Sequence, residues 1–146
     1  MRTRSRKNIV KQLDTIFSLF IRKRNSKNEI AECYTCGRSD HYKKLQCGHF
    51  MSRKNYATRW NEINCQVQCY ACNVARYGEQ FKFGLKLDID YGKGCAEELQ
   101  IKSNKIVKYS NDDLLEKIEP LIEIFDNIIK ILQKAIKALP AQFATV

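Results

Sequence analysis

Residues 33–73 read CYTCGRSDHYKKLQCGHFMSRKNYATRWNEINCQVQCYACN. The segment opens with one Cys-x-x-Cys pair, Cys33 and Cys36, and closes with a second, Cys69 and Cys72. Four thiolates complete a tetrahedron around Zn²⁺ and leave no position for a substrate, so we predict a structural zinc that joins the two ends of the segment. A thioredoxin-type redox pair is the alternative, but it requires a βαβ pattern that this chain does not show.

The other three cysteines are Cys47, Cys65 and Cys95. Seven is an odd number, and the N-terminus lacks the apolar stretch of a secretory signal, so reduced thiols are favoured over a disulfide framework. We interpret these three side chains as small buried apolar groups. Because the chain also lacks a run of about 18 apolar residues, we expect a cytoplasmic protein with no membrane partner.

The charge balance is strongly positive. Lys and Arg number 26 against 16 Asp and Glu, which gives a formal net charge of +10 and an isoelectric point near 9.3. Such a molecule is attracted to polyanions, and nucleic acid is the partner that we expect. Charge alone does not distinguish DNA from RNA.

Three polar residues between and beside the cysteine pairs carry the candidate chemistry: His49, Asn64 and Asn73. An imidazole with a pKa near neutrality can take a proton from water. A carboxamide oxygen can bind Mg²⁺ together with waters and phosphate oxygens. The segment therefore indicates metal-assisted cleavage of a phosphodiester bond.

Two amphipathic segments flank this region. Residues 8–21 carry apolar side chains at helical spacing and end in the basic run Arg22, Lys23 and Arg24, which either contacts phosphates or is a solvated helix end. Near the C-terminus an alternating three- and four-residue spacing predicts a helix with a heptad seam. Pro120 predicts a kink or a break in that helix near Glu119. The seam consists of Leu114, Ile118, Leu121, Phe125, Ile128, Leu132, Ala135 and Leu139.

Elements closer to the cysteines are less sharply patterned. Residues 42–51 are predicted to form a strand pair around His49, and residues 70–78 a helix that ends at Gly78. Apolar residues alternate strictly over residues 81–90, which favours a strand, although Gly84 interrupts it and a short helix is the alternative. Residues 99–107 are polar and weakly patterned.

These motifs carry a family resemblance. The series Cys-x-x-Cys, Gly48-His49-Phe50, Asn64-Cys65 and Cys-x-x-Cys-Asn73 resembles the HNH, or ββα-metal, endonucleases. It is more closely similar to the phage NinG (Rap) recombination endonucleases. It also resembles phage endonuclease VII, in which an Asn after the second zinc-binding pair binds the catalytic metal. The resemblance spans residues 33 to about 85.

The resemblance implies a role for each polar residue. His49 would be the general base, Asn73 a ligand of a catalytic Mg²⁺ or Mn²⁺, and Asn64 the residue that holds the histidine-bearing loop. It also implies branched DNA, such as a Holliday junction or a D-loop, as substrate, and the host cytoplasm as the location of a phage-encoded protein.

One departure concerns the residue before the histidine. Many HNH enzymes place Asp or His there as a second metal ligand, whereas this chain has Gly48. The second ligand is therefore open, with Gln46, Asp40, His41 and Glu79 as candidates by proximity in the sequence. Contacts to DNA are assigned to Arg53, Lys54 and Arg59, of which the two arginines either clamp a phosphate or lie solvated.

We therefore predict an α+β protein with a zinc-stapled HNH nuclease unit at residues 31–92. Residues 1–30 are its basic N-terminal helix, and residues 93–146 are a linker and a C-terminal helical arm. The apolar seam of this arm either pairs with a second copy in a homodimer, which we favour, or folds back on the helix around Ile9 to Phe20 of the same chain. The predicted activity is Mg²⁺-dependent DNA endonuclease. The alternatives are a non-catalytic zinc-containing DNA- or RNA-binding module and an interaction protein that recruits a partner through the arm.

Overall fold

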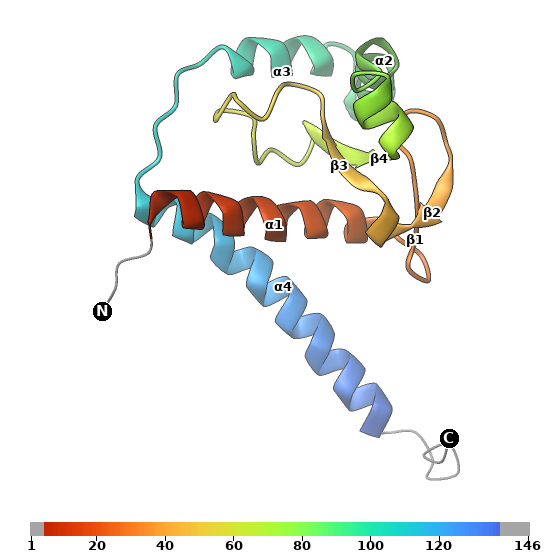
Figure 1. Cartoon of the computed structure of the whole chain (residues 1–146), viewed down its shortest axis with the longest axis vertical. Helices are drawn as coiled ribbons and strands as arrows, with labels where there is room; N and C mark the ends of the chain where they lie inside the picture. The colour runs from red at the N-terminus through yellow and green to blue at the C-terminus, as the bar shows by residue number, and fades with distance from the viewer. Residues whose placement is uncertain (1–4, 138–146) are drawn as a thin grey trace. The chain divides into compact units, whose positions relative to one another are not determined.

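Helix α1 (Arg6–Arg24) begins the described part of this computed structural model, which comprises residues 5–137 (Figure 1). Its buried side chains recur every fourth residue, at Ile9, Leu13, Phe17 and Ile21, so the helix predicted at residues 8–21 is confirmed. The contacts divide the chain into two units. One unit contains the start of α1, as far as Ile16, together with α4, and the other is Phe17–Ser110.

Two small antiparallel sheets form the centre of the second unit. Strand β1 (Ile30–Glu32) pairs with β2 (Ser39–His41), and the turn between them carries the first cysteine pair. A 3₁₀ turn, Tyr42–Lys44, leads into β3 (Gln46–His49). Strand β3 pairs with β4 (Cys65–Gln68), with His49 opposite Cys65 and Gln46 opposite Gln68.

The prediction that residues 42–51 pair with one another as two strands is thus wrong, although β3 itself is a strand within this range. Residues 42–44 form the 3₁₀ turn, and β3 finds its partner in the more distant β4. The helix expected over residues 70–78 is a single π-helical turn, Ala71–Ala75. It ends three residues before the predicted stop, and Gly78 follows in the turn, where it has a φ of +86° and donates its N–H to the Cys72 carbonyl.

Residues 80–91 form helix α2 (Gln80–Tyr91), so the strand favoured by the alternation at residues 81–90 is wrong. Phe83 and Leu87 are fully buried, whereas Phe81 and Ile89 are 79 % and 80 % exposed, so the face with a period of four contacts the core. Gly84 suits this packing, because a Cβ there would lie 3.3 Å from the Phe50 ring.

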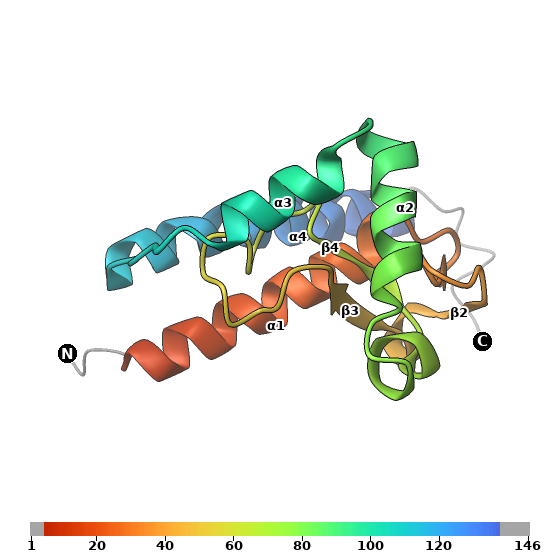
Figure 2. The same ribbon diagram turned by 90° about the horizontal axis from the view of Figure 1, so that it is seen from above.

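Helix α3 (Cys95–Ser103) follows α2 along the chain (Figure 2). Leu99 of α3 packs with Phe83 and Leu87 of α2, and Tyr34 and Phe50 cover the same cluster. The sequence did not predict α3, since Leu99 is its one buried large apolar side chain.

In the other unit, α4 (Asn111–Lys137) is one helix with Pro120 inside it, so of the two predicted alternatives, a kink or a break, the break is wrong. A proline removes one backbone hydrogen bond, and the bonds of the remaining turns are sufficient to continue the helix. Leu114 and Ile118 are buried, whereas Ile122 and Ile128 are exposed. The predicted seam continues to Leu139, which lies outside the described residues.

None of the helices within residues 5–137 has the length and apolar character needed to cross a membrane.

Candidate metal and nucleic-acid site

The four paired cysteines meet at one point between the β1–β2 turn and the end of β4. Their sulfur atoms all lie within 4.8 Å of one another, and the Cys36 and Cys69 sulfurs are 3.8 Å apart. Two sulfurs bound to one tetrahedral zinc at about 2.3 Å would be about 3.8 Å apart. Cys33, Cys69 and Cys72 are buried and Cys36 is exposed. The cluster therefore fits a structural zinc.

Electrostatics around these sulfurs favours a bound cation. Burial raises the pKa of Cys33, but N–H donors from Cys69 and the Thr35 hydroxyl outweigh it and lower that pKa to about 6. Desolvation and the neighbouring thiols raise the pKa of Cys36 to about 12. Four thiolates so close together repel one another unless a cation compensates their charge. Arg76 supplies part of this charge, with Nη2 3.0 Å from the Cys72 sulfur.

His49, the predicted base, is half-buried at the end of β3. Its Nε2 lies 3.2 Å from the backbone carbonyl oxygen of Arg59. A carbonyl oxygen can only accept, so this bond assigns the ring proton to Nε2 and leaves the lone pair on Nδ1. The imidazole is therefore oriented by the loop after β3.

Asn64 connects both ends of that loop to the start of β4. Its Oδ1 accepts the Met51 N–H at 2.7 Å, and its Nδ2 donates to the carbonyls of Met51 and Thr58, each at 3.0 Å. The side chain is fully buried, so losing these bonds would leave several polar groups unsatisfied, at about 1–3 kcal/mol each. Asn64 therefore holds the loop beside His49 in place.

Asn73, the predicted metal ligand, contacts Gln46. The Asn73 Nδ2 donates to Gln46 Oε1 at 2.7 Å, which leaves the Asn73 carboxamide oxygen outside that bond. Gln46 and His49 are three positions apart on β3, so their side chains leave opposite faces of the strand. Asn73 and Gln46 therefore lie on one face and His49 on the other.

The other three candidates for the second ligand have ionic partners. Asp40 is paired with Lys44, and its lowered pKa reflects first the His41 N–H bond to its carboxylate. His41 pairs with Glu29, and Glu79 pairs with Arg76 and Lys82. Of the four candidates for the second metal ligand, Gln46 is the one whose described contacts place it beside Asn73.

Gly48 has no room for a side chain. A Cβ there would lie 2.0 Å from Oε1 of Gln68, which is fully buried. The Gln68 Nε2 donates to Thr35 and to the Gly78 carbonyl, so its carboxamide joins the two cysteine-bearing segments. An acidic ligand directly before His49 is therefore sterically excluded.

The loop after His49 is basic and aromatic. Arg53 and Lys54 are exposed. Arg59 lies over the rings of Tyr56 and Trp60 at 5.3 and 5.2 Å and donates to the Arg53 carbonyl at 2.9 Å. Arg59 is thus held in place by the loop, whereas the Arg53 and Lys54 side chains extend to solvent.

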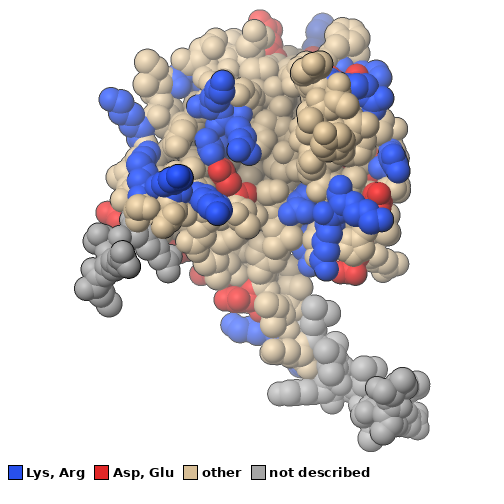
Figure 3. All heavy atoms as spheres, viewed as in Figure 1, with Lys and Arg blue, Asp and Glu red and all other residues tan. Residues whose placement is uncertain are grey.

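Positive charge is concentrated in the same unit. Residues 17–110 contain 17 Lys and Arg against 9 Asp and Glu, and no acidic residue occurs between Asp40 and Glu62. Lys and Arg are spread over the face in Figure 3, with few acidic side chains among them. This surface suits a polyanion.

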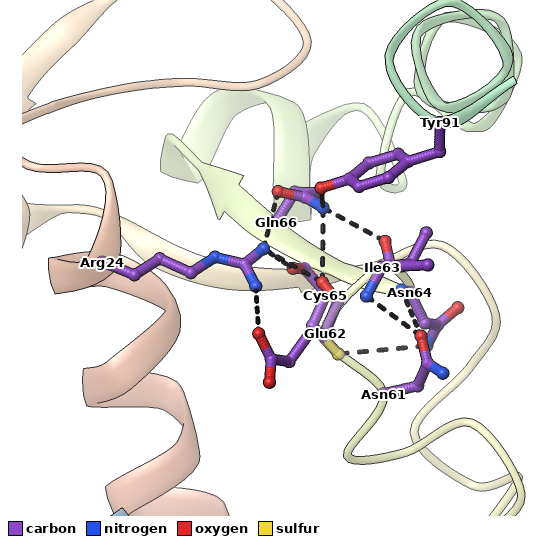
Figure 4. A network of polar contacts seen from close by, with 8 residues as sticks. All are labelled: Arg24, Asn61, Glu62, Ile63, Asn64, Cys65, Gln66 and Tyr91. Atoms are coloured by element: carbon purple, nitrogen blue, oxygen red, sulfur yellow. Dashed lines mark hydrogen bonds and ion pairs between the residues drawn. The ribbon is translucent and has the colours of Figure 1, made fainter. Parts of the chain in front are cut away.

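Arg24 has neither of the roles considered for it from the sequence, phosphate contact or solvated helix end. It donates to the carbonyls of Glu62 and Cys65 and to the Gln66 side chain, each at 3.0 Å, and pairs with the Glu62 carboxylate (Figure 4). Gln66 in turn donates to the Tyr91 hydroxyl at 3.0 Å. The arginine therefore connects the end of α1 to β4.

A second cluster was missed by sequence reasoning. The ligand atoms of Cys47, His49 and Cys65 lie within 4.8 Å of one another. The interpretation of Cys47 and Cys65 as simple apolar groups is therefore incomplete. The two-residue spacing of Cys47 and His49 is the sequence signal for this cluster, because it puts both side chains on one face of a strand. The third member, Cys65, could be found only by knowing that β4 is the neighbouring strand.

The fold and the cysteine cluster define a small, basic α+β protein in which four cysteines, from the β1–β2 turn and the segment after β4, are arranged so that they could hold a zinc ion. Residues 1–135 match the family described as Bacteriophage Lambda NinG protein, and the chain belongs to that family. The match extends well beyond the motifs at residues 33–85. No curated protein and no solved structure matches the chain.

Proposed function

We propose that this protein is a metal-dependent DNA endonuclease of the HNH type. The observation that carries the proposal is the hydrogen bond from His49 Nε2 to the Arg59 carbonyl, which fixes the orientation and the tautomer of the imidazole. A histidine so oriented can deprotonate a water for attack on a phosphodiester. Asn64 supports this geometry because it binds both ends of the loop that supplies the carbonyl.

Asn73 and Gln46 are the residues that we propose as ligands of the catalytic Mg²⁺ or Mn²⁺. Both offer carboxamide oxygens, and their side chains touch. Magnesium sites in proteins commonly complete their shell with waters and substrate phosphates, which here would supply the negative charge that two neutral ligands lack. When bound, such an ion stabilises the charge that develops on the leaving oxygen.

The substrate would meet these groups at the unpaired edge of β3. Within residues 5–137, β3 pairs with β4 alone, so side chains from both faces of β3 can reach a phosphate at its other edge. Arg53, Lys54 and Arg59 follow β3 directly and would contact the neighbouring phosphates. Membership of the phage family suggests a role in recombination, and we propose branched DNA as the substrate.

Cleavage of a labelled four-way junction tests the proposal, with a linear duplex of the same sequence as control and with Mg²⁺, Mn²⁺ or EDTA present. We expect metal-dependent cuts near the branch. The substitution His49→Ala should lower the cleavage rate by about 10²–10⁴-fold, which is the usual contribution of a general base, while the affinity for DNA changes little.

Matched variants make the result specific. His41→Ala removes the other histidine and should retain cleavage, as should Asn104→Ala, whereas Asn73→Ala should be inactive or require more divalent metal. Wild-type protein that binds the junction but cuts no substrate with either metal would instead establish the non-catalytic binding module. A His49→Ala variant that cuts at the wild-type rate would refute the assignment of the base.

A further inference from the structure

The cluster of Cys47, His49 and Cys65 is separate from the four-cysteine site and shares no residue with it. The cluster arises from sheet geometry. Cys47 and His49 are two positions apart on β3, so their side chains lie on the same face, and Cys65 of β4 is paired with His49. Their ligand atoms lie within 4.8 Å of one another. Cys65 is fully buried, whereas Cys47 and His49 are half-buried, so an ion could enter from that side.

We propose that these three residues form a second metal site, selective for Zn²⁺ and chemically similar divalent ions. Two thiols and one imidazole form a set of soft and borderline ligands, which favours zinc or cobalt over Mg²⁺. Three protein ligands leave a fourth position open, unlike the closed four-cysteine site.

The Arg59 carbonyl provides independent support. It lies 3.2 Å from His49 Nε2 and 3.5 Å from the Cys65 sulfur, so one backbone oxygen positions two of the three side chains. Histidines that bind metals usually donate their second ring N–H to such a carbonyl or to a carboxylate, which fixes the tautomer. His49 has this arrangement when Nδ1 is the nitrogen that binds the ion.

Occupancy of this site would regulate the enzyme, a consequence that rests on the proposed function. A nitrogen lone pair that binds a metal cannot accept a proton from water. Zinc bound to Cys47, His49 and Cys65 would therefore inhibit cleavage by occupying the base, while Mg²⁺ would not bind there.

Cobalt spectroscopy on the full chain tests the site without reference to activity. Reduced protein that contains one zinc per chain is titrated with Co²⁺. Zinc binds more tightly than cobalt in such sites, so the four-cysteine site keeps its zinc and a new thiolate-to-cobalt absorption band reports the second site. We expect one further equivalent of cobalt and this band in the wild type, and loss of both in Cys47→Ala and His49→Ala.

Cys95→Ala is the matched control, because Cys95 is half-buried like Cys47 but lies on α3 outside both clusters. It should bind the second equivalent as the wild type does. Retention of one zinc per chain in every variant checks that each has folded. A wild type without a second equivalent, or a Cys47→Ala variant with an unchanged band, would overturn the proposal.

The regulatory consequence has its own readout. Zinc added beyond the first equivalent should slow Mg²⁺-supported cleavage by the wild type, and each variant is compared with its own zinc-free rate. Inhibition should be lost in Cys47→Ala. A protein that shows the cobalt band but has no nuclease activity would refute the proposed function alone, whereas an active nuclease without the band would refute the second site alone.

Discussion

Gly48 illustrates how one missing side chain shapes the site. The buried carboxamide of Gln68 occupies the space that any side chain at position 48 would need. That carboxamide also binds Thr35 and the Gly78 carbonyl, so it cannot move without breaking contacts between the two cysteine-bearing segments. The glycine is therefore a packing requirement, and any ligand of the proposed catalytic metal must come from another position.

We expect Gly48→Ala to lower the free energy of unfolding by about 1–3 kcal/mol, the usual cost of overpacking a core. Urea denaturation of the zinc-loaded protein measures it. Gln68→Ala removes the clashing group, so in a double-mutant cycle the two changes should cost at least about 0.5 kcal/mol less together than the sum of the single changes. An additive cycle would show that Gln68 does not exclude the side chain.

Arg24 also acts at this scale, and its role depends on burial. Its guanidinium group lies where three backbone and side-chain oxygens of the segment around β4 converge, which makes it unavailable for phosphate. Basic residues that do extend to solvent, such as Arg53 and Lys54, are better candidates for DNA contacts. Charge in the sequence therefore locates a partner only after internal hydrogen bonds have been assigned.

At the scale of elements, α4 has an apolar face that its own unit covers only at the start. Leu114 and Ile118 are buried, in the unit that also contains the buried Ile9 and Leu13 of α1. Five large apolar side chains between residues 122 and 131 are exposed, namely Ile122, Ile124, Ile128, Ile129 and Ile131, and Phe125 among them is half-buried. Each isoleucine that becomes buried in an interface would contribute about 1.5–3 kcal/mol.

We propose that this face pairs with a second copy of the chain, and we expect light scattering to give the mass of a dimer at micromolar concentration. Phe125→Asp, on the seam, should give a monomer because it places a charge in the apolar interface. Asn127→Asp introduces the same charge off the seam and should leave the dimer intact. A wild-type monomer with an unchanged mass in Phe125→Asp would exclude pairing through this helix.

At the scale of the whole molecule, we expect the fold of the central unit to depend on a zinc ion held by the four cysteines. The strands of its two sheets are only three or four residues long, and the two cysteine pairs come from segments far apart in the chain. Structural zinc sites have apparent binding free energies of about 10–16 kcal/mol. Typical domains are stable by only about 5–15 kcal/mol, so we expect this unit to fold only with the metal bound.

Metal analysis should therefore find at least one tightly bound zinc per chain. Cys72→Ser should abolish it and unfold the central unit, as seen by circular dichroism, whereas Cys95→Ser should keep both zinc and fold. Protons compete with zinc for thiolates, so lowering the pH or adding a chelator should have the same effect as Cys72→Ser. A Cys72→Ser variant that remains folded without metal would contradict this dependence.

Some features could be predicted from local spacing alone. Two Cys-x-x-Cys pairs indicated a cluster of four thiols, and repeats of three and four residues indicated α1 and α4, because ligand spacing and helical periodicity are local properties. The charge of the chain likewise follows from composition. Residues 81–90 mark the limit of this reasoning, since an alternating apolar pattern fits both a strand and a helix whose core face includes only Phe83 and Leu87.

Other features depend on which segments become neighbours. The pairing of β3 with β4 brings Cys65 to His49 and Cys47, and the packing of Gln68 against Gly48 excludes a side chain there. Asn73 reaches Gln46 across 27 residues, and Arg24 reaches Gln66 across 42. These contacts join residues far apart in the chain, so no local pattern encodes them, and only the folded structure brings their atoms together.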